Sequence, residues 1–102
     1  MTFRVQIRFE INPGMEKGFE DTWLSIGSVI TGDPGNIGQW LSRDAEDESV
    51  YYVMSDWVDE KQFREFEHSA AHVEHRTKLH PFRRGGSMAT MEIVHALRGA
   101  AA

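Results

Sequence analysis

Positions 3 to 11 alternate strictly between apolar and polar residues. This period of two predicts a strand with one buried face. Asn12-Pro13 then offers a capping side chain followed by a proline suited to the first helical position, which predicts that a helix begins there. The turn residues Gly32–Gly35 are expected to end this helix. Its buried stripe, with apolar residues three or four positions apart, consists of Met15, Phe19, Trp23, Ile26 and Ile30.

Two segments rich in β-branched and aromatic residues follow, Asn36–Asp44 and Ser49–Val58, and they predict a hairpin. Asp59, with Gln62 three residues later, resembles a capping box and predicts a second helix. Pro81 is expected to stop that helix, because the residue before a proline is pushed out of helical geometry. Its expected buried stripe consists of Phe63, Phe66, Ala70 and Val73.

The end of the chain predicts a last strand, Ser87–Leu97, with Ala89, Met91, Ile93 and Leu97 on one face. We expect one domain over residues 1–98 and a frayed tail over residues 99–102. The order β-α-β-β-α-β is typical of an α+β, ferredoxin-like fold, in which both helices cover one face of a four-stranded antiparallel sheet. Tyr51–Met54 is apolar on both faces, so we expect a second copy to cover the other face as a homodimer.

Composition narrows the partners of this 102-residue chain. Acidic residues outnumber basic ones by 16 to 11, giving a net charge of −5, which is the wrong sign for holding a phosphate backbone, so we expect no nucleic acid. The absence of cysteine excludes disulfides, thiolate metal sites and a cysteine nucleophile. No apolar run is long enough for a membrane span, and we expect a cytoplasmic protein without a membrane partner.

Histidines offer candidate chemistry at two places. His68, His72 and His75 share one face of the second predicted helix, where they either present imidazoles to a transition metal or form a solvated polar face. The second interpretation is favoured, because their mean direction lies opposite the predicted buried stripe. In the last predicted strand, His95 is expected to lie on the same face as the apolar residues. It is either a satisfied core histidine or a buried general base.

Three further features of the sequence indicate a function less specifically than the histidines do. The acidic stretch Asp44–Glu48 lacks the ligand spacing of a calcium loop, which favours a solvated turn. Arg83 and Arg84, beside two glycines, suit either a flexible surface loop or an anion site at a pocket mouth. Large aromatic residues are abundant, and they line both ordinary cores and pockets for flat ligands.

One set of residues, spread over nearly the whole chain, has the order and the spacing that are found in a known protein family. The set is Pro13, Gly14, Glu16, Phe19, Trp23, Pro34, Gly35, Leu41, Arg43, Tyr52, Ser55, Trp57, Asp59, Phe63, Ser69, His72 and Leu79. The chain therefore resembles the antibiotic biosynthesis monooxygenase superfamily of dimeric α/β barrels. The resemblance implies a homodimer with facing sheets and a pocket in each subunit. It also implies a cofactor-independent monooxygenase that acts with O₂ on a hydrophobic aromatic or polyketide-like molecule.

The resemblance also suggests site residues. Trp57 matches the tryptophan that lines the pocket of the anthrone-type oxygenases, and His72 or His95 is expected to act as the base. The expected pocket walls are Trp23, Trp40, Tyr52, Val53 and Phe63. No metal or cofactor is expected.

Two alternatives stay open. His72 lies near the iron-binding histidine of the haem-degrading members, which suggests haem binding and degradation, although neither Gln6 nor Arg8 replaces their first-strand asparagine. Val53 and Phe63 stand where the anthrone-type enzymes have asparagine and tyrosine. The loss of these polar groups suggests a non-catalytic, dimeric module that binds a small molecule.

Overall fold

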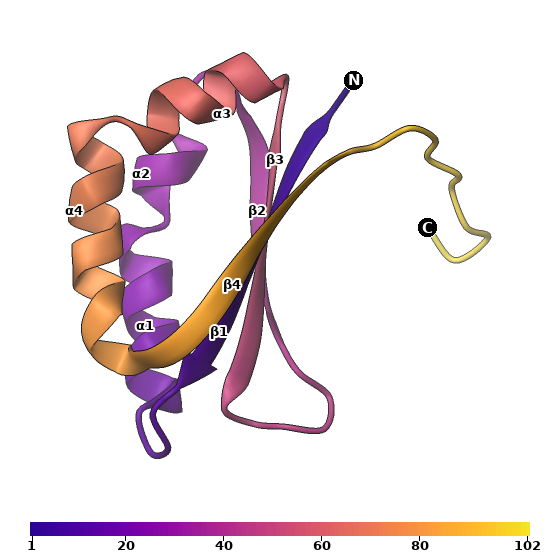
Figure 1. The fold of residues 1–102 in the computed structure, drawn as a ribbon. Helices are drawn as coiled ribbons and strands as arrows, with labels where there is room; N and C mark the ends of the chain where they lie inside the picture. The colour runs from indigo at the N-terminus through magenta and orange to yellow at the C-terminus, as the bar shows by residue number, and fades with distance from the viewer.

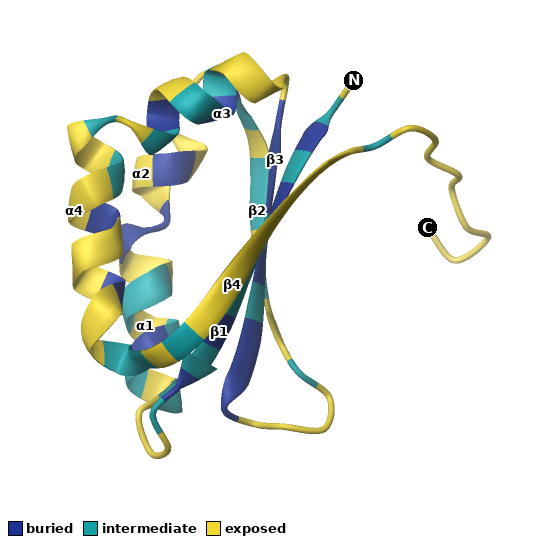
Figure 2. Ribbon diagram, viewed as in Figure 1, coloured by how far each residue is buried: buried dark blue, intermediate teal, exposed yellow.

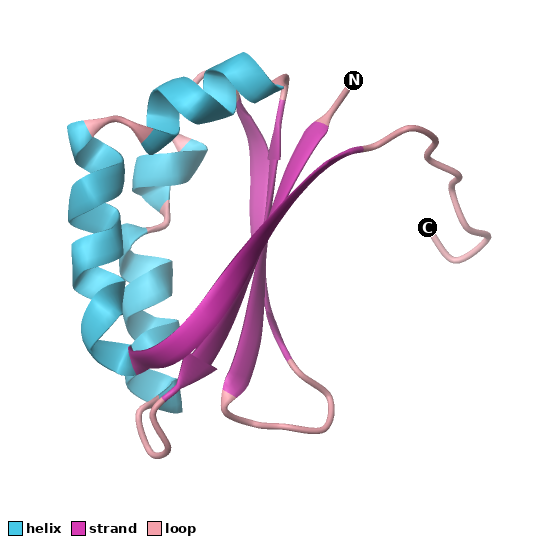
Figure 3. Cartoon of the chain, viewed as in Figure 1, coloured by secondary structure: helices cyan, strands magenta, loops and turns pink.

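Four antiparallel strands form a single sheet in the computed structural model, which describes residues 1–102. Their spatial order is β2-β3-β1-β4, so the first strand lies beside the last. The helices lie together on one face of the sheet (Figures 1 and 3). The strands are β1 (Phe3–Ile11), β2 (Asn36–Arg43), β3 (Val50–Trp57) and β4 (Arg83–Glu92). This arrangement confirms the α+β, ferredoxin-like fold.

The helical layer is divided into shorter pieces than the sequence predicts. The first crossover contains α1 (Glu16–Ile26) and α2 (Ser28–Thr31). The second contains α3 (Glu60–Glu67), α4 (Ala70–Leu79) and the 3₁₀ turn η1 (His80–Phe82). No helix combines the length and the apolar character that a membrane crossing requires.

The core follows from the alternation along β1 and β3. Phe3, Val5, Phe9 and Ile11 are buried toward the helices, while the polar residues between them lie on the outer face. Their partners on β3 include the buried residues Tyr51, Ser55 and Trp57. The buried side chains form two apolar clusters, and partly buried Ile7 packs against both of them. Figure 2 shows the buried residues between the two layers.

The first helix begins later than predicted. Met15 N donates to Asn12 O over 3.0 Å, and Gly14 has a φ of +89°. Proline followed by a residue of positive φ is the pattern of a type II turn, which the sequence Asn12-Pro13-Gly14-Met15 fits. The expectation that Asn12 caps the helix is therefore wrong, because the glycine after Pro13 allows a turn that a helix would not contain.

The second predicted helix is interrupted at His68-Ser69. Asp59 does cap α3, as predicted, by accepting from Gln62 N over 2.8 Å. Ser69 then caps α4 by accepting from His72 N over 3.2 Å. Because the chain turns between the two helices, α4 buries His75 and Leu79, while Ala70 and Val73 are exposed. The predicted stripe holds for α3 and is wrong for α4.

The last strand is shifted toward the N-terminus from its predicted range. It begins at Arg83 and ends at Glu92, which pairs with Phe3 at the start of β1. Beyond Glu92 the strand has no partner residue in β1, and the final contact is Ile93 N donating to Thr2 O over 3.0 Å. Residues 94–102 are exposed and extend away from the body of the molecule (Figure 1). The prediction of a strand up to Leu97 is wrong.

Candidate active site

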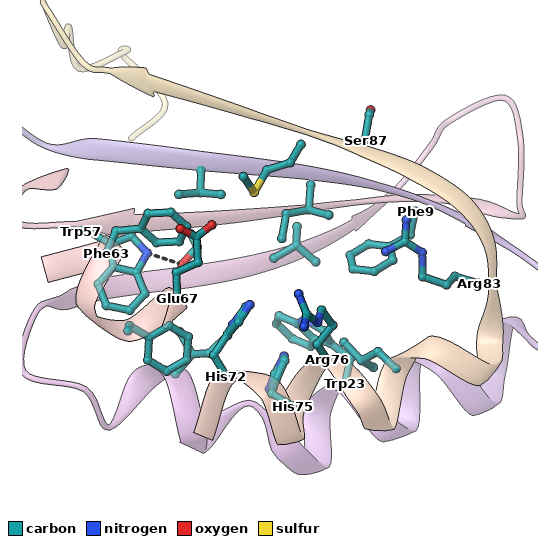
Figure 4. A pocket seen from close by; sticks show the side chains of 18 residues that line it. Phe9, Trp23, Trp57, Phe63, Glu67, His72, His75, Arg76, Arg83 and Ser87 are labelled. Carbon is teal, nitrogen blue, oxygen red and sulfur yellow. Dashed lines mark hydrogen bonds between the residues drawn. The ribbon is translucent and has the colours of Figure 1, made fainter. Parts of the chain in front are cut away.

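A cavity of about 340 Å³ lies between the inner face of the sheet and the helices. Figure 4 shows its lining, which comes from β1, β3 and β4 on one side and from all four helices, α1 to α4, on the other. Eleven of its 18 lining residues are hydrophobic. An apolar cavity of this size with a few polar groups is typical of small-molecule sites.

Trp57 forms a rigid wall at one end of the cavity. Its side chain is only 1% exposed, and its indole Nε1 donates to Ser55 Oγ over 2.9 Å. Its ring packs against Phe63 and Phe66, with centroids 5.7 Å and 5.2 Å away. Because the N–H is engaged and the ring is clamped on two sides, Trp57 presents a fixed aromatic surface to a ligand.

His72 and His75 project from α4 into the cavity (Figure 4). His75 is 7% exposed and His72 is partly buried, and the Nδ1 atom of each is buried without a hydrogen-bond partner. His68 is different, because its side chain is 80% exposed and does not line the cavity. The prediction that these three histidines form one solvated face therefore fails for His72 and His75, because α4 restarts at Ser69 with its own buried face.

Burial lowers the pKa of both cavity imidazoles and so favours their neutral form. Desolvation lowers the pKa of His72, and the nearby charges of Arg76 and His68 lower it further against the opposing effect of Glu67. Desolvation likewise lowers the pKa of His75, with His72 and Lys78 acting in the same direction and the Ile26 backbone acting against them. A neutral imidazole at neutral pH accepts a proton, so each histidine is suited to general base catalysis.

Charged side chains of opposite sign line the two ends of the cavity, and the carboxylate at one end is neutralised by an ion pair. Glu67 lies near Trp57 and Phe63, and Arg64 Nη1 holds its carboxylate over 3.1 Å. Arg83, at the start of β4, places its guanidinium over the Phe9 ring at 5.4 Å from the centroid. No group of three or more histidine, aspartate or glutamate side chains is arranged to hold a metal ion.

Of the other predicted pocket residues, three line the cavity and two lie on the outer face of the sheet. Trp23, Val53 and Phe63 line the cavity. Trp40 does not, because it pairs with Met54 on the outer face of the sheet, where it is 50% exposed. Tyr52 also lies outside the cavity, and its hydroxyl donates to Asp44 Oδ2 over 3.3 Å. Successive strand residues point to opposite faces, so inward Val53 excludes its neighbour Tyr52 from the same cavity.

His95 lies in the exposed tail after β4 and does not line the cavity. Its predicted burial depended on a strand that continues to Leu97, and the strand ends at Glu92. Arg83 lines the cavity, whereas its neighbour Arg84 is exposed and does not. The cavity residues missed by sequence reasoning are Val5, Ile7, Phe9, Ile30, Ser55, Phe66, Glu67, His75, Arg76, Leu79, Ser87 and Met88. Ser69, a capping residue three positions before His72, is the signal that would have found His75.

Comparison with known structures supports the fold. SnoaB of Streptomyces nogalater, described as a cofactor-independent oxygenase, superposes with a TM-score of 0.85 at 18% identity, over 96% of this chain and 98% of that one. A Bordetella bronchiseptica protein assigned to the antibiotic biosynthesis monooxygenases gives a TM-score of 0.84 at 20% identity, over 92% and 98%. Rv0793 of Mycobacterium tuberculosis gives 0.76 at 14% identity, over 98% and 99%.

The family follows from a direct match of the sequence. No curated protein matches the chain significantly. The family model described as "Antibiotic biosynthesis monooxygenase" matches residues 2–78, which include α3, most of α4 and the first three strands. The chain therefore belongs to the antibiotic biosynthesis monooxygenase family.

Proposed function

We propose that the protein is a cofactor-independent monooxygenase that oxidises a hydrophobic aromatic, polyketide-like molecule with O₂. The observation that carries this proposal is the cavity itself, in which a fixed aromatic wall faces the imidazoles of buried His75 and partly buried His72, whose Nδ1 atoms have no hydrogen-bond partner. A flat ring system fits between Trp57 and the apolar side chains of β1. The membership of the family and the likeness to SnoaB support this class of reaction.

The proposed reaction begins with proton transfer. A phenol or an activated ring methylene gives a proton to the neutral imidazole of His72, and burial keeps this imidazole unprotonated. The resulting carbanion transfers one electron to O₂, and the carbon radical and superoxide then combine to a peroxide at that carbon. Imidazolium returns the proton to the peroxide, which loses water to leave a ketone. One oxygen atom enters the product as the ketone oxygen and the other leaves as water, and the substrate carbon supplies all four electrons that reduce O₂.

The protein's own part in this reaction is to exclude water, orient the ring and hold the proton. Val53 and Phe63 contribute apolar surface in place of the polar groups expected from the resemblance. Besides Glu67, whose carboxylate is already paired with Arg64, His72 and His75 are then the groups near the Trp57 end of the cavity that are able to move a proton. This favours an imidazole base in this chain.

The proposed assembly is a homodimer formed through the outer face of the sheet. This face carries exposed apolar side chains, among them Trp40 at 50% and Met91 at 38%. The helices cover only the opposite face (Figure 3). Large apolar side chains gathered on one uncovered surface are typical of protein interfaces.

Oxygen consumption with a dihydroxyanthrone tests the proposed reaction. The protein should accelerate O₂ uptake above the rate without protein, and His72→Gln should lower the protein-dependent rate by about 100-fold, the usual contribution of a general base. Trp57→Phe should also lower it, because the wall loses its larger ring. His68→Gln is the matched control, since His68 is exposed outside the cavity, and it should keep the wild-type rate.

Two outcomes would overturn this proposal. Equal O₂ uptake with and without protein, combined with saturable binding of the anthrone, would instead support the non-catalytic module. A Soret shift on addition of haemin that disappears in His72→Gln would support haem binding. The buried, unpartnered Nδ1 of His72 favours this second candidate, although Gln6 and Arg8 lie on the outer face of the sheet and offer no first-strand partner.

A further inference from the structure

Ser55 places a buried hydroxyl at the Trp57 end of the cavity. It lies on β3 between Val53 and Trp57 in the inward-facing row, it lines the cavity with them, and it is only 6% exposed. Alternate residues of a strand point to the same face, so the three side chains share one direction. The reaction proposed above uses the aromatic wall and an imidazole at this end and gives the hydroxyl no part.

Two donors occupy the oxygen of Ser55. Trp57 Nε1 donates to Ser55 Oγ over 2.9 Å, and Asn36 Nδ2 donates to the same atom over 3.3 Å. Figure 4 marks the bond from Trp57 with a dashed line. An indole N–H and an amide NH₂ group can only donate, so Ser55 Oγ is the acceptor in both bonds. Because a hydroxyl oxygen accepts through two lone pairs, both of them are used.

Backbone carbonyls fix the orientation of the Asn36 amide. Its Nδ2 also donates to the backbone oxygen of Asp56 over 3.1 Å and to that of Gly38 over 3.5 Å. An amide turned the other way would set its own oxygen against these two acceptors. The group that faces Ser55 is therefore the NH₂ group, and it cannot accept the hydrogen of the serine hydroxyl.

The hydroxyl hydrogen of Ser55 has no acceptor within the protein. Ser55 Oγ is not the donor in any hydrogen bond of the structure. Glu67 lines the same end of the cavity, but its carboxylate is paired with Arg64 over 3.1 Å and forms no hydrogen bond with Ser55. A buried donor without a partner is costly. A ligand that fills this end of the cavity should therefore bring an acceptor oxygen to Ser55.

The imidazole of His72 borders the same end of the cavity from α4. Its ring packs edge-on against Phe66, with centroids 5.3 Å apart, and Phe66 packs against Trp57 at 5.2 Å. A ring ketone held here can lose a proton from its activated methylene to the imidazole. The electron pair of the broken C–H bond then forms a C=C bond, and the ketone oxygen becomes an oxyanion. A hydroxyl that is polarised by two donors is suited to stabilise this charge.

We infer that Ser55 is a further catalytic residue, which donates its hydroxyl hydrogen to the ketone oxygen of the substrate and stabilises the oxyanion that forms there. This inference rests on the proposed function and completes its first step. The imidazole receives the proton, and Ser55 holds the oxygen that receives the negative charge. The substrate class narrows accordingly to aromatic molecules with a ketone conjugated to the reacting carbon.

Infrared spectroscopy of bound xanthone tests the hydrogen bond from Ser55. Xanthone is a tricyclic aromatic ketone with an ether oxygen where anthrone has its methylene, so it offers an acceptor but cannot lose the ring proton. Its carbonyl carbon is isotopically labelled to separate its C=O band from those of the protein. In the wild type this band should lie at lower frequency than in an alkane solvent, because a hydrogen bond weakens the C=O bond. Ser55→Ala should return it toward the alkane position.

Oxygen uptake with the dihydroxyanthrone tests the catalytic role. Ser55→Ala should lower kcat by about 100-fold, the usual effect of removing one donor to an oxyanion, and should change KM much less. Ser55→Thr should restore most of kcat and the low-frequency band, since threonine keeps the hydroxyl. Ser42→Ala is the matched control, because Ser42 is exposed on β2 opposite Tyr52 and outside the cavity. It should behave as the wild type does.

The wild-type band is a measurement that does not depend on how well a variant folds. This matters because Ser55→Ala also leaves the Trp57 and Asn36 donors without their acceptor. A wild-type band at the alkane position would overturn the inference. An equal band in the wild type and Ser55→Ala would do the same, and so would a Ser55→Thr variant as slow as Ser55→Ala. The aromatic cavity stands in each case, since xanthone is bound.

Failure of the oxygenase proposal gives a different pattern. If Ser55 lowers the frequency of the C=O band but the protein does not accelerate O₂ uptake, the contact with the ketone stands and the oxygenase proposal fails. If the band responds to Ser55 and Ser55→Ala keeps the wild-type kcat, the oxygenase proposal stands and the catalytic role of Ser55 is wrong. If xanthone does not bind, both the contact and the aromatic cavity are wrong.

Discussion

Burial decides what each histidine of this chain can do. His68 ends α3 and His75 lies in α4, so the two are close in sequence. Even so, His75 is 7% exposed, whereas the His68 side chain is 80% exposed. Trp57 could be assigned to the pocket from sequence, because its place at the end of a predicted strand and the family resemblance agreed. His75 could not, because the apolar spacing that assigned the buried stripe continued past Ser69 and gave α4 the wrong face.

Because His75 is buried in its neutral form, the free energy of unfolding should depend on pH. Its pKa is lowered in the folded protein, so the unfolded chain binds more protons once the pH falls below the ordinary histidine value of about 6.5. The contribution to stability is complete above that value and is lost as the pH falls toward the lowered pKa. Urea unfolding between about pH 5 and pH 7.5 should show this decline.

His75→Gln should make this pH dependence less steep, because glutamine does not titrate in this range, whereas His72, whose pKa is also lowered, still does. His68→Gln should keep the wild-type slope, since His68 is exposed and gains nothing from burial. An unchanged slope in His75→Gln would show that its pKa is the same in the folded and unfolded chain.

At the level of elements, the break between α3 and α4 positions the candidate site. Local signals predicted the cap at Asp59, the hairpin and the order of strands, because each depends on a few neighbouring residues. The end of β4 could not be predicted locally, since it depends on where β1 begins: Glu92 pairs with Phe3, and no strand residue lies beyond. The face of the sheet on which Trp40 lies depends in the same way on a distant residue, because Trp40 pairs with Met54.

Ser69 should stabilise this break measurably. Its Oγ accepts from His72 N over 3.2 Å and donates to Phe66 O over 2.6 Å, so it joins the end of α3 to the start of α4. Ser69→Ala should lower the free energy of unfolding by about 1 kcal/mol, the usual contribution of such a cap. Ser69→Asn should retain most of it, because asparagine also caps. Urea unfolding measures both, and an alanine variant as stable as the wild type would contradict this role.

The whole molecule has two unlike sheet faces. The inner face is covered by helices and contains the cavity, whereas the outer face mixes exposed apolar residues with the ion pair of Arg4 and Asp56. Asp56 is only 5% exposed on this face, held by two hydrogen bonds from Arg4 of 2.8 and 2.9 Å. Beyond it the tail carries Val94 and Leu97, which are 70% and 97% exposed. In a single chain these apolar side chains are exposed to solvent. The apolar segment Tyr51–Met54 had already led us to expect an apolar sheet face that the helices do not cover.

If the outer face is a dimer interface, one charge placed on it should separate the subunits. Light scattering at micromolar concentration should give about twice the 11.7 kDa of one chain for the wild type. Trp40→Glu should reduce this mass toward that of the monomer, because the new carboxylate would be buried unpaired in the interface. Leu24→Glu is the matched control, since Leu24 is 74% exposed on α1, on the helical side of the molecule, and its variant should remain dimeric. A wild-type mass of one chain would contradict the dimer, and equal dissociation by both variants would place the interface elsewhere than on the sheet.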